Sequence, residues 1–431
     1  MIINIFILIF VCLFKNNNNL LLEYKRSFYK EENETFYFTE YFNNYIGTKL
    51  CFGSNNQCLI LNFELNSFPT WIITYKSKSH NKIQTLYDQF SSESFYLKDS
   101  STHVYVHSKF HWTYFCYDKL SFQNYNIDDY FFLGVEIFYD LPVNSGIIGL
   151  DCQNRKKSYI PELNFIGQLK RNKIINNYSF SFIYKKFDDH KREEGNFLIG
   201  ELPNKYLWNL NNKTLVYKNI MKIEDELKWG FEVDKIYAGN YKIENISKVG
   251  FSIEHGVIIG SYEYKEYIIK TFFNALFENK TCYSERFEDL FQGFVCDNNL
   301  NTDSFENLIF KIGMKEFVFT KDDLFIKNDK NKTLFLVTFP SKDWYFTNID
   351  WTFGVPFFKK YIVVFDMDKK SIGYYIDKKE SNYELYINYL NIRNICIILS
   401  ILIIFLFVFL LFYSKKKKPN KINNYSQIQE T

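Results

Sequence analysis

The chain has 431 residues, of which 47% are hydrophobic and 20% aromatic, so it is long enough for about two to three domains with large cores. Its formal net charge is only +3. The sequence also has no basic stripe interleaved with aromatic residues, so we predict no nucleic-acid partner.

The N-terminal end is an apolar run, MIINIFILIFVCLF, which is followed by Lys15. Residues 1–14 are too short to span a bilayer comfortably. We predict that they form a secretory signal peptide, with a short N-terminal strand or anchor as the alternative. Residues 15–37 are then a short N-terminal segment. The first strand is expected near Phe36 to Tyr45, which leaves little room for a pro-segment.

Short β-type runs fill the region between the two apolar ends of the chain. Four of them are residues 103–122, 228–243, 315–326 and 359–376. Helical periodicity is clearest at residues 264–277, where one stripe carries Ile268, Phe272, Leu276 and Phe277. The pattern predicts a large, mainly β ectodomain.

Three histidines, His103, His107 and His111, recur every four residues. On a helix this spacing would place them on one face, as a metal site requires. Because they lie in a β-rich run, where the side chains would be widely spaced, we predict no metal site. The chain also lacks the G-x-S-x-G turn of serine hydrolases, and we expect no cofactor.

The C-terminal end carries a second apolar run, Ile395 to Tyr413, which contains no charge and has about the length of a bilayer core. Four lysines, Lys415 to Lys418, follow it. We predict a transmembrane helix at 395–413 after a juxtamembrane linker at 379–394, with a helix buried in a soluble core as the alternative. The chain is then a single-pass type I membrane protein of the secretory pathway or cell surface. Its ectodomain is luminal or extracellular, and its basic tail at 414–431 is cytosolic.

Six cysteines lie in the predicted ectodomain, namely Cys51, Cys58, Cys116, Cys152, Cys282 and Cys296. An even number in a secreted domain favours disulfides. We prefer the pairs that are near in sequence, Cys51 with Cys58 and Cys282 with Cys296, which leaves Cys116 and Cys152; other connectivities stay open. Sequons for N-glycosylation begin at Asn33, Asn177, Asn212, Asn245, Asn279 and Asn331.

Two distant parts of the chain repeat one pattern. FEL at 63–65 and IEH at 253–255 each place a carboxylate at the end of an apolar strand. Each is followed by a later apolar-apolar-glycine strand, IIG ending at Gly149 and TFG ending at Gly354. Two similar β lobes would explain the repeat.

The stretch WTFGVPFFKKYIVVFDMDKKSIGYY, residues 351–375, resembles the closing segment of pepsin-like aspartic peptidases. That family ends on W-x-x-G-x-x-F-x-x-x-Y-x-x-x-F-D, a polar hairpin and then I-G. The positions in register are Trp351, Gly354, Phe357, Tyr361, Phe365, Asp366, Ile372 and Gly373.

Other landmarks of the same family follow in the expected order. They are GSNNQCLILNFE at 53–64, Trp71, SGIIGL at 145–150, GNFLIGELPNKYL at 195–207, KWGFEVDKIYAG at 228–239 and residues 294–319. The resemblance spans about residues 38 to 378. It implies a two-lobed pepsin-like fold, with an N-terminal β lobe at 38–185 and a C-terminal β lobe at 186–378.

In that family two aspartates, one from each lobe, share one proton across a water, and each begins a D-T/S-G turn. The aligned triplets in this chain are Glu64-Leu65-Asn66 and Glu254-His255-Gly256. The resemblance therefore implies that Glu64 and Glu254 are the catalytic pair. It also implies that Ser67, Gly256 and the flap residue Tyr105 contact the substrate.

The two triplets depart from the family pattern. Each carboxylate is one methylene longer than an aspartate, and a misplacement of about 1 Å can cost ~100-fold in rate. Leu65 has no hydroxyl with which to brace the opposite loop. We therefore predict a catalytically impaired monomer that binds an extended peptide or protein in the inter-lobe cleft. Two alternatives stay open: an active endopeptidase that uses Glu64 and Glu254, and a different register of the loops, with Asp151 and Asp234 as the nearest candidates.

Overall fold

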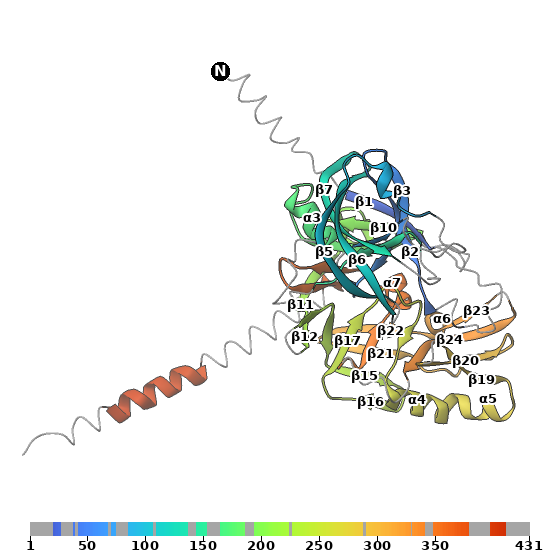
Figure 1. Cartoon of the computed structure of the whole chain (residues 1–431). Helices are drawn as coiled ribbons and strands as arrows, with labels where there is room; N and C mark the ends of the chain where they lie inside the picture. The colour runs from blue at the N-terminus through green and yellow to red at the C-terminus, as the bar shows by residue number, and fades with distance from the viewer. Residues whose placement is uncertain are drawn as a thin grey trace, which may run out of the picture. The chain divides into compact units, whose positions relative to one another are not determined.

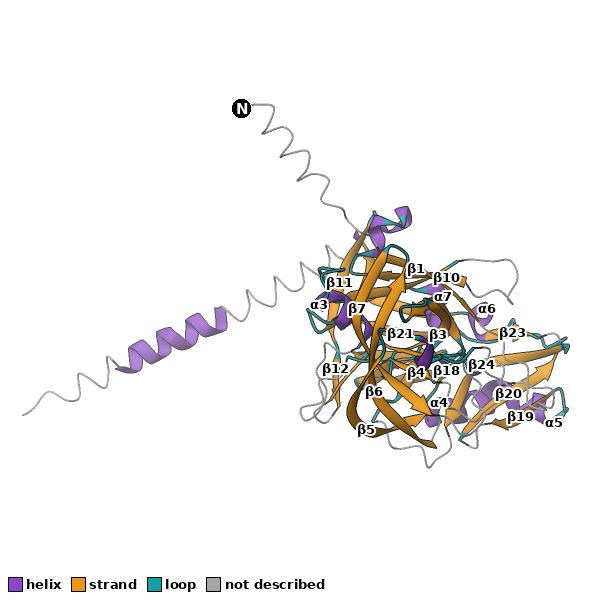
Figure 2. Ribbon diagram, turned by 45° about the horizontal axis from the view of Figure 1, so that its top comes forward, coloured by secondary structure: helices purple, strands orange, loops and turns teal. Residues whose placement is uncertain are grey.

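β-Strands make up most of the described structure, as the short apolar runs predict (Figures 1 and 2). The computed structural model describes residues 20–26, 38, 42–67, 70–74, 85–106, 109–136, 144–152, 164–185, 194–223, 226–287, 290–328, 330–340, 348–378 and 397–410, with 99–106 and 109–111 by backbone alone. The predicted signal peptide at 1–14, linker at 379–394 and tail at 414–431 lie outside these ranges. The chain divides into two compact units, Met1–Ile376 and Asp377–Thr431.

Thirteen of the described strands form one long sheet. In hydrogen-bonded order they are β11 (Lys213–Asn219), β27 (Ser371–Asp377), β26 (Val363–Asp366), β9 (Ser179–Tyr184), β10 (Glu194–Ile199), β1 (Leu20–Arg26), β2 (Ile46–Phe52), β3 (Gln57–Glu64), β8 (Gly146–Gly149), β4 (Trp71–Ile73), β7 (Tyr125–Glu136), β6 (Lys109–Phe122) and β5 (Tyr96–Val106). β26 is antiparallel to both β9 and β27. Two strands from late in the chain therefore join the sheet beside β9, which comes from the middle of the chain.

The strands of the C-terminal half form three further sheets. Eight strands make the largest: β14 (Gly230–Val233), β17 (Ser247–Phe251), β25 (Trp351–Phe353), β18 (Ile258–Ile259), β24 (Lys332–Pro340), β20 (Phe291–Asp297) and β19 (Cys282–Phe287), with β23 (Phe325–Lys327) beside β24. Another is formed by β16 (Tyr241–Ile243), β15 (Lys235–Ala238), β21 (Leu308–Ile312) and β22 (Lys315–Phe319). The smallest pairs β12 (Met221–Ile223) with β13 (Glu226–Lys228).

The two halves of the chain repeat one strand arrangement. In the first, β3 is parallel to β8, β8 is antiparallel to β4, and β4 is parallel to β7. In the second, β17 is parallel to β25, β25 is antiparallel to β18, and β18 is parallel to β24. The IIG segment lies within β8. The TFG segment begins in β25 and ends at Gly354, directly after that strand. The repeated sequence pattern therefore corresponds to a repeated topology. The boundary between lobes at 185/186 stays a prediction.

Strand β1 lies where we expected only a short N-terminal segment, so the expectation that the first strand falls near residues 36–45 is wrong. β1 pairs with β10 from Leu20 opposite Ile199 to Lys25 opposite Glu194. Its alternate side chains Leu20, Leu22 and Tyr24 are buried, which is the period-two pattern of a strand with one face on the core.

The helix predicted at 264–277 is confirmed, and it contains a π-helical turn. α4 (Tyr262–Ile268) continues through η5 (Ile269–Phe273) into α5 (Asn274–Glu278). The π turn adds one residue, so the buried positions step from Ile268 to Phe273 and Phe272 is only partly buried. The other labelled helices of the first unit are η1 (Gln89–Ser91), α3 (Phe165–Arg171), η3 (Pro203–Lys205), η4 (Trp208–Leu210), α6 (Lys321–Leu324) and α7 (Val355–Lys360).

Both cysteine pairs preferred from the sequence are disulfide-bonded. Cys51–Cys58 joins β2 to β3, and Cys282–Cys296 joins β19 to β20, each between residues directly opposite in the ladder. Cys116 and Cys152 are buried and are not joined by a third disulfide bond. The sequon asparagines within the described ranges, Asn177, Asn212, Asn245, Asn279 and Asn331, are all exposed, and Asn33 lies outside those ranges.

Aromatic side chains pack the core where the two halves of the chain meet. The indole of Trp229 is 1% exposed and meets the rings of Phe180 and Phe365 edge-on, with centroids 5.6 and 5.1 Å away. Its Nε1 donates a hydrogen bond of 2.8 Å to the carbonyl oxygen of Leu150. Edge-to-face aromatic pairs contribute roughly 0.5–1.5 kcal/mol each beyond their burial, so this cluster holds the Leu150 and Trp229 segments together.

The second unit contains a described helix at residues 397–410, within the predicted membrane segment 395–413. Its apolar side chains, such as Phe405 and Phe409, are exposed. Residues 395, 396 and 411–413 lie outside the described ranges. Among the helices that the structure describes, none is both long and apolar enough to cross a membrane.

Candidate active site

Glu64 is the last residue of β3. The alternate residues Leu59, Leu61 and Phe63 are buried, so Glu64 projects from the opposite face of the strand and is half-buried. Parallel pairing with β8 places Glu64 opposite Gly149. The carbonyl oxygen of Glu64 accepts a hydrogen bond of 2.9 Å from the N–H of Leu150, so the backbone is fixed at the point where the carboxylate emerges.

Glu254 lies in the loop that follows β17, and the backbone of Gly354 packs closely against that loop. A Cβ atom at residue 354 would lie 2.0 Å from the carbonyl oxygen of Val257 and 2.4 Å from that of His255. The N–H of Val355 donates 2.8 Å to the same His255 carbonyl. Only glycine allows this close approach, which explains why the repeated pattern ends on a glycine.

A segment before β2 holds the Glu254 loop from the other side. The N–H of Asn44 donates 2.7 Å to the carbonyl oxygen of Glu254, and its side-chain amide donates 2.9 Å to that of Ile253. The N–H of Gly256 donates 2.9 Å to the carbonyl oxygen of Phe42. The loop is therefore anchored by residues more than two hundred positions earlier in the chain.

The two loops meet through the carboxylate of Glu254. The side-chain amide of Asn66 donates 2.7 Å to Oε1 of Glu254, and the N–H of Leu65 lies 3.4 Å from Oε2. The same Asn66 amide is 3.5 Å from the carbonyl oxygen of Phe251. Hydrogen bonds to an ionised carboxylate are stronger than neutral ones, so this contact ties the loop after β3 to the loop after β17.

The electrostatics of the two carboxyls differ. Burial and the nearby charge of Glu254 raise the pKa of Glu64 to about 8. Burial also raises the pKa of Glu254, but hydrogen bonds from Asn66, Leu65 and Ser252 oppose the shift. The groups titrate as a coupled pair, and the hydrogen-bond donors favour the charge on Glu254 and the proton on Glu64.

His255 occupies the position where the family has a hydroxyl residue. Its Nδ1 lies 2.7 Å from Oγ of Ser252, and its ring packs on Phe42 with centroids 4.6 Å apart. Burial lowers the pKa of His255 to about 4, so the imidazole is neutral above that pH. The side chain contacts its own loop and the segment before β2.

The three candidate substrate-binding residues lie in two regions, the loops after the two glutamates and strand β5. Gly256 and Ser67 follow the two glutamates, and the carbonyl oxygen of Ser67 accepts 3.1 Å from the N–H of Asp151. Tyr105 lies in β5 opposite Phe110 of β6, and the structure describes only the backbone there. Their contacts with a substrate stay predictions.

The remaining candidates take part in other contacts. Asp234 accepts a hydrogen bond of 2.6 Å from the N–H of Gly313 at the β21–β22 turn. His107 lies outside the described residues, and His103 and His111 are described by backbone alone. Within the part of the chain that the structure describes, no three His, Cys, Asp or Glu side chains form a group that could hold a metal ion.

Sequence reasoning missed Asn44, Asn66 and Ser252. From the sequence, we identified Asn66 only as part of the aligned triplet, whereas its amide reaches Glu254. An Asn two positions after a strand-ending carboxylate is a signal that could have suggested a donor. The acceptor could not be identified in this way, because it lies 188 positions further along the chain.

Comparison with known proteins identifies the fold. Residues 44–375, more than half of the chain, match the family model described as Eukaryotic aspartyl protease. The match includes Glu64, Glu254 and the closing segment 351–375. No curated protein matches the chain.

Proposed function

The chain belongs to the eukaryotic aspartyl protease family, and on that premise we propose that it is a catalytically impaired member that binds an extended peptide or protein segment between its two lobes. The observation that carries this proposal is the bonding of Glu254. Both oxygens of its carboxylate face donors of the opposite loop, Asn66 and the N–H of Leu65.

The chemistry of the family explains why this bonding matters. One carboxyl acts as a base on a water held between the pair, while the other supplies a proton to the substrate. The carboxylate that should activate the water must direct an oxygen lone pair at it. Here the longer Glu254 side chain braces the loop at Leu65 and Asn66 instead. The same contact that joins the loops therefore competes with catalysis.

Peptide binding is supported by the strand at the end of the long sheet. β5 is the last described strand in the hydrogen-bonded order, so among the described residues no strand pairs with its outer edge, where a further strand can add. Tyr96 and Leu97 on β5 and Trp112 on β6 are 46%, 52% and 50% exposed. Exposed apolar side chains beside a free strand edge are suited to an extended peptide with apolar residues.

An active endopeptidase is the second candidate, and the ionisation of the pair favours it. With a pKa of about 8, Glu64 keeps its proton at acid and neutral pH, beside a carboxylate at Glu254 whose charge contributes to that pKa. One protonated and one ionised carboxyl is the arrangement that the family reaction requires. In this case Glu64 is the acid and Glu254 the base.

A cleavage assay decides between the two candidates. We expect the full-length protein to release no more peptide from a denatured protein, between about pH 3 and pH 7, than Glu64→Gln and Glu254→Gln variants release. The same proteins should still bind a fluorescent denatured substrate. Cleavage by the wild type that both substitutions abolish would establish the endopeptidase, and absence of binding would contradict the peptide-binding proposal.

We further propose that the chain enters the secretory pathway and is anchored by residues 395–413. The two disulfides support an oxidising compartment. The charge-free run before Lys415, with exposed apolar side chains at 397–410, supports the anchor.

Alkaline carbonate extraction of cell membranes tests the anchor. We expect the full chain to stay in the membrane pellet, because carbonate removes proteins that are held by surface charge alone. A variant truncated after residue 394 should be released into the soluble fraction. Extraction of the full chain by carbonate would contradict the proposal.

A further inference from the structure

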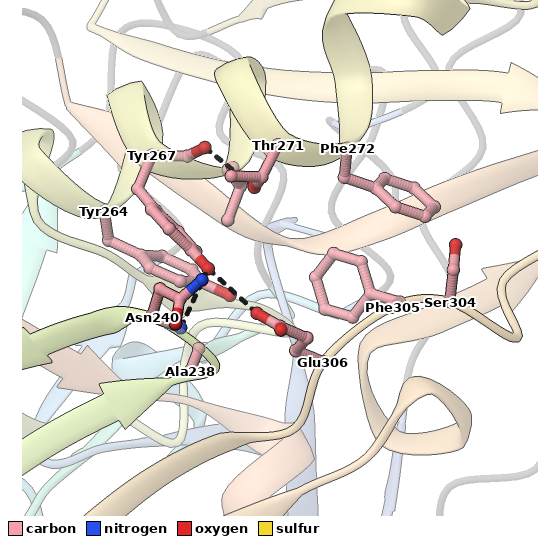
Figure 3. A pocket seen from close by; sticks show the side chains of 10 residues that line it. Ala238, Asn240, Tyr264, Tyr267, Thr271, Phe272, Ser304, Phe305 and Glu306 are labelled. Carbon is pink, nitrogen blue, oxygen red and sulfur yellow. Dashed lines mark hydrogen bonds between the residues drawn. The ribbon is translucent and has the colours of Figure 1, made fainter.

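A cavity of about 200 Å³ lies against the helix α4–η5–α5 in the C-terminal half of the chain (Figure 3). The helix forms one side, and the loops at Ala238–Asn240 and Ser304–Glu306 form the other. None of its lining residues belongs to the loops that carry Glu64 and Glu254. Its volume is below that of the usual drug-sized pocket, so it suits a small group of atoms.

Four aromatic rings line part of the cavity wall. The rings of Tyr264 and Tyr267 are stacked, with centroids 6.5 Å apart, and those of Phe272 and Phe305 meet edge to face at 4.9 Å. Figure 3 shows the two phenylalanine rings beside one another, away from the tyrosine oxygens. Faces of aromatic rings carry negative charge density and attract cations.

Three oxygen-bearing side chains converge at the other end of the cavity (Figure 3). The hydroxyl of Tyr267 donates 2.8 Å to Oε2 of Glu306. The hydroxyl of Tyr264 is buried, and it has no hydrogen-bond partner among the described residues. A buried hydroxyl without a partner is costly, so the hydroxyl of Tyr264 would gain from a polar group bound in the cavity.

The π-helical turn is an independent indication of a site. η5 runs from Ile269 to Phe273 and places Thr271 and Phe272 at the cavity. π turns inside α-helices are rare, and they occur frequently at functional sites. A regular α-helix would have brought Phe272 rather than Phe273 into register with the buried positions Tyr264 and Ile268.

We propose that this cavity binds a protonated primary amine at the end of a short alkyl chain, as in a lysine side chain. Glu306 supplies the negative charge, and no Lys, Arg or His is among the described residues that line the cavity. The tyrosine oxygens can accept the remaining N–H donors of an ammonium group, which has three. The apolar rings of Phe272 and Phe305 are suited to the alkyl chain.

Other ligand classes fit the cavity less well. An anion would be repelled by the carboxylate of Glu306. A wholly apolar group would leave the hydroxyl of Tyr264 unpartnered and would remove water from Glu306, both of which carry a free-energy cost. An amine removes both costs at once.

Calorimetric titration of the full-length protein tests the proposal. The probes are Nα-acetyl-lysine-N-methylamide and its uncharged analogue Nα-acetyl-norleucine-N-methylamide. We expect the lysine amide to bind at least tenfold more tightly. A third probe, n-butylamine, distinguishes the source of the amine: equal affinity indicates a free alkylamine, and weaker affinity indicates a lysine side chain of a peptide or protein.

Matched variants locate the binding. Glu306→Gln should weaken binding of the lysine amide at least tenfold, and Tyr264→Phe several-fold. Glu316→Gln is the control, because Glu316 accepts a similar hydrogen bond of 2.7 Å from Tyr237 and does not line the cavity. Equal affinity for the lysine and norleucine amides, absence of binding up to the solubility of the lysine amide, or equal losses in Glu306→Gln and Glu316→Gln would overturn the proposal.

Discussion

Replacing Glu64 with Gln is expected to stabilise the protein at pH 8 and to remove the contribution of Glu64 to a fall in stability as pH rises from about 4.5 to 8. The folded-state pKa of Glu64 is about 8, against an ordinary value of 4.5. Between these values the folded state binds more protons than the unfolded chain. The contribution of Glu64 to the free energy of unfolding must therefore decrease as pH rises through this window. The lowered pKa of His255 acts in the opposite direction up to about pH 6.5, so the two contributions separate between about pH 6.5 and pH 8.

The magnitude depends on how well water reaches the carboxylate. Glu64 is half-buried, so the full shift overstates its cost and must be discounted for solvent screening. We expect Glu64→Gln to gain about 1–3 kcal/mol over the wild type at pH 8, and little at pH 4.5. Urea unfolding of the full chain, followed by tryptophan fluorescence at both pH values, measures the difference.

Two further variants isolate the cause. Glu23→Gln is the control, because the Glu23 side chain is 74% exposed and its removal should leave the pH profile unchanged. Glu254→Gln removes the charge that helps to raise the pKa of Glu64, so the fall in stability should be complete at a lower pH. If Glu64→Gln and the wild type lost stability in parallel, the proton would not reside on Glu64.

The fold could be predicted because its signals are local or periodic. The apolar run that ends at Glu64 identifies β3, and the glycine of the TFG segment marks the close approach at Gly354. The strand repeat follows from these short patterns. Each signal lies within a few residues of the feature that it predicts.

The parts of the site that escaped prediction depend on distant partners. Asn66 matters because Glu254 is opposite it, and nothing within the segment 61–71 indicates that contact. The π turn was not predicted for another reason. A one-residue insertion hardly changes an apolar stripe, and because Phe272 and Phe273 are both apolar, the sequence does not reveal that Phe273 is the buried one. Strand β1 was not predicted because it lies close to the apolar run at residues 1–14, which we interpreted as a signal peptide.

Restoring the family triplets should create peptidase activity, which is the largest effect that we expect. The five substitutions are Glu64→Asp, Leu65→Thr, Asn66→Gly, Glu254→Asp and His255→Ser. They shorten both carboxylates, remove the Asn66 amide from the second one and supply hydroxyls to brace the loops. Because a misplacement of about 1 Å costs ~100-fold in rate, we expect cleavage of denatured protein at acid pH to rise by at least that factor over the wild type.

The same experiment tests whether the loops that carry Glu64 and Glu254, or another part of the chain, cause the impairment. Leu65 is fully buried, so a second variant keeps Leu65 and makes the other four substitutions, which protects the core. The control carries Glu64→Asn in place of Glu64→Asp and must be inactive. If both restored variants fold with wild-type melting temperatures and cleave no more than this control, the loops do not cause the impairment. The bonding of Glu254 by Asn66 and Leu65 would then be a consequence of lost activity rather than its reason.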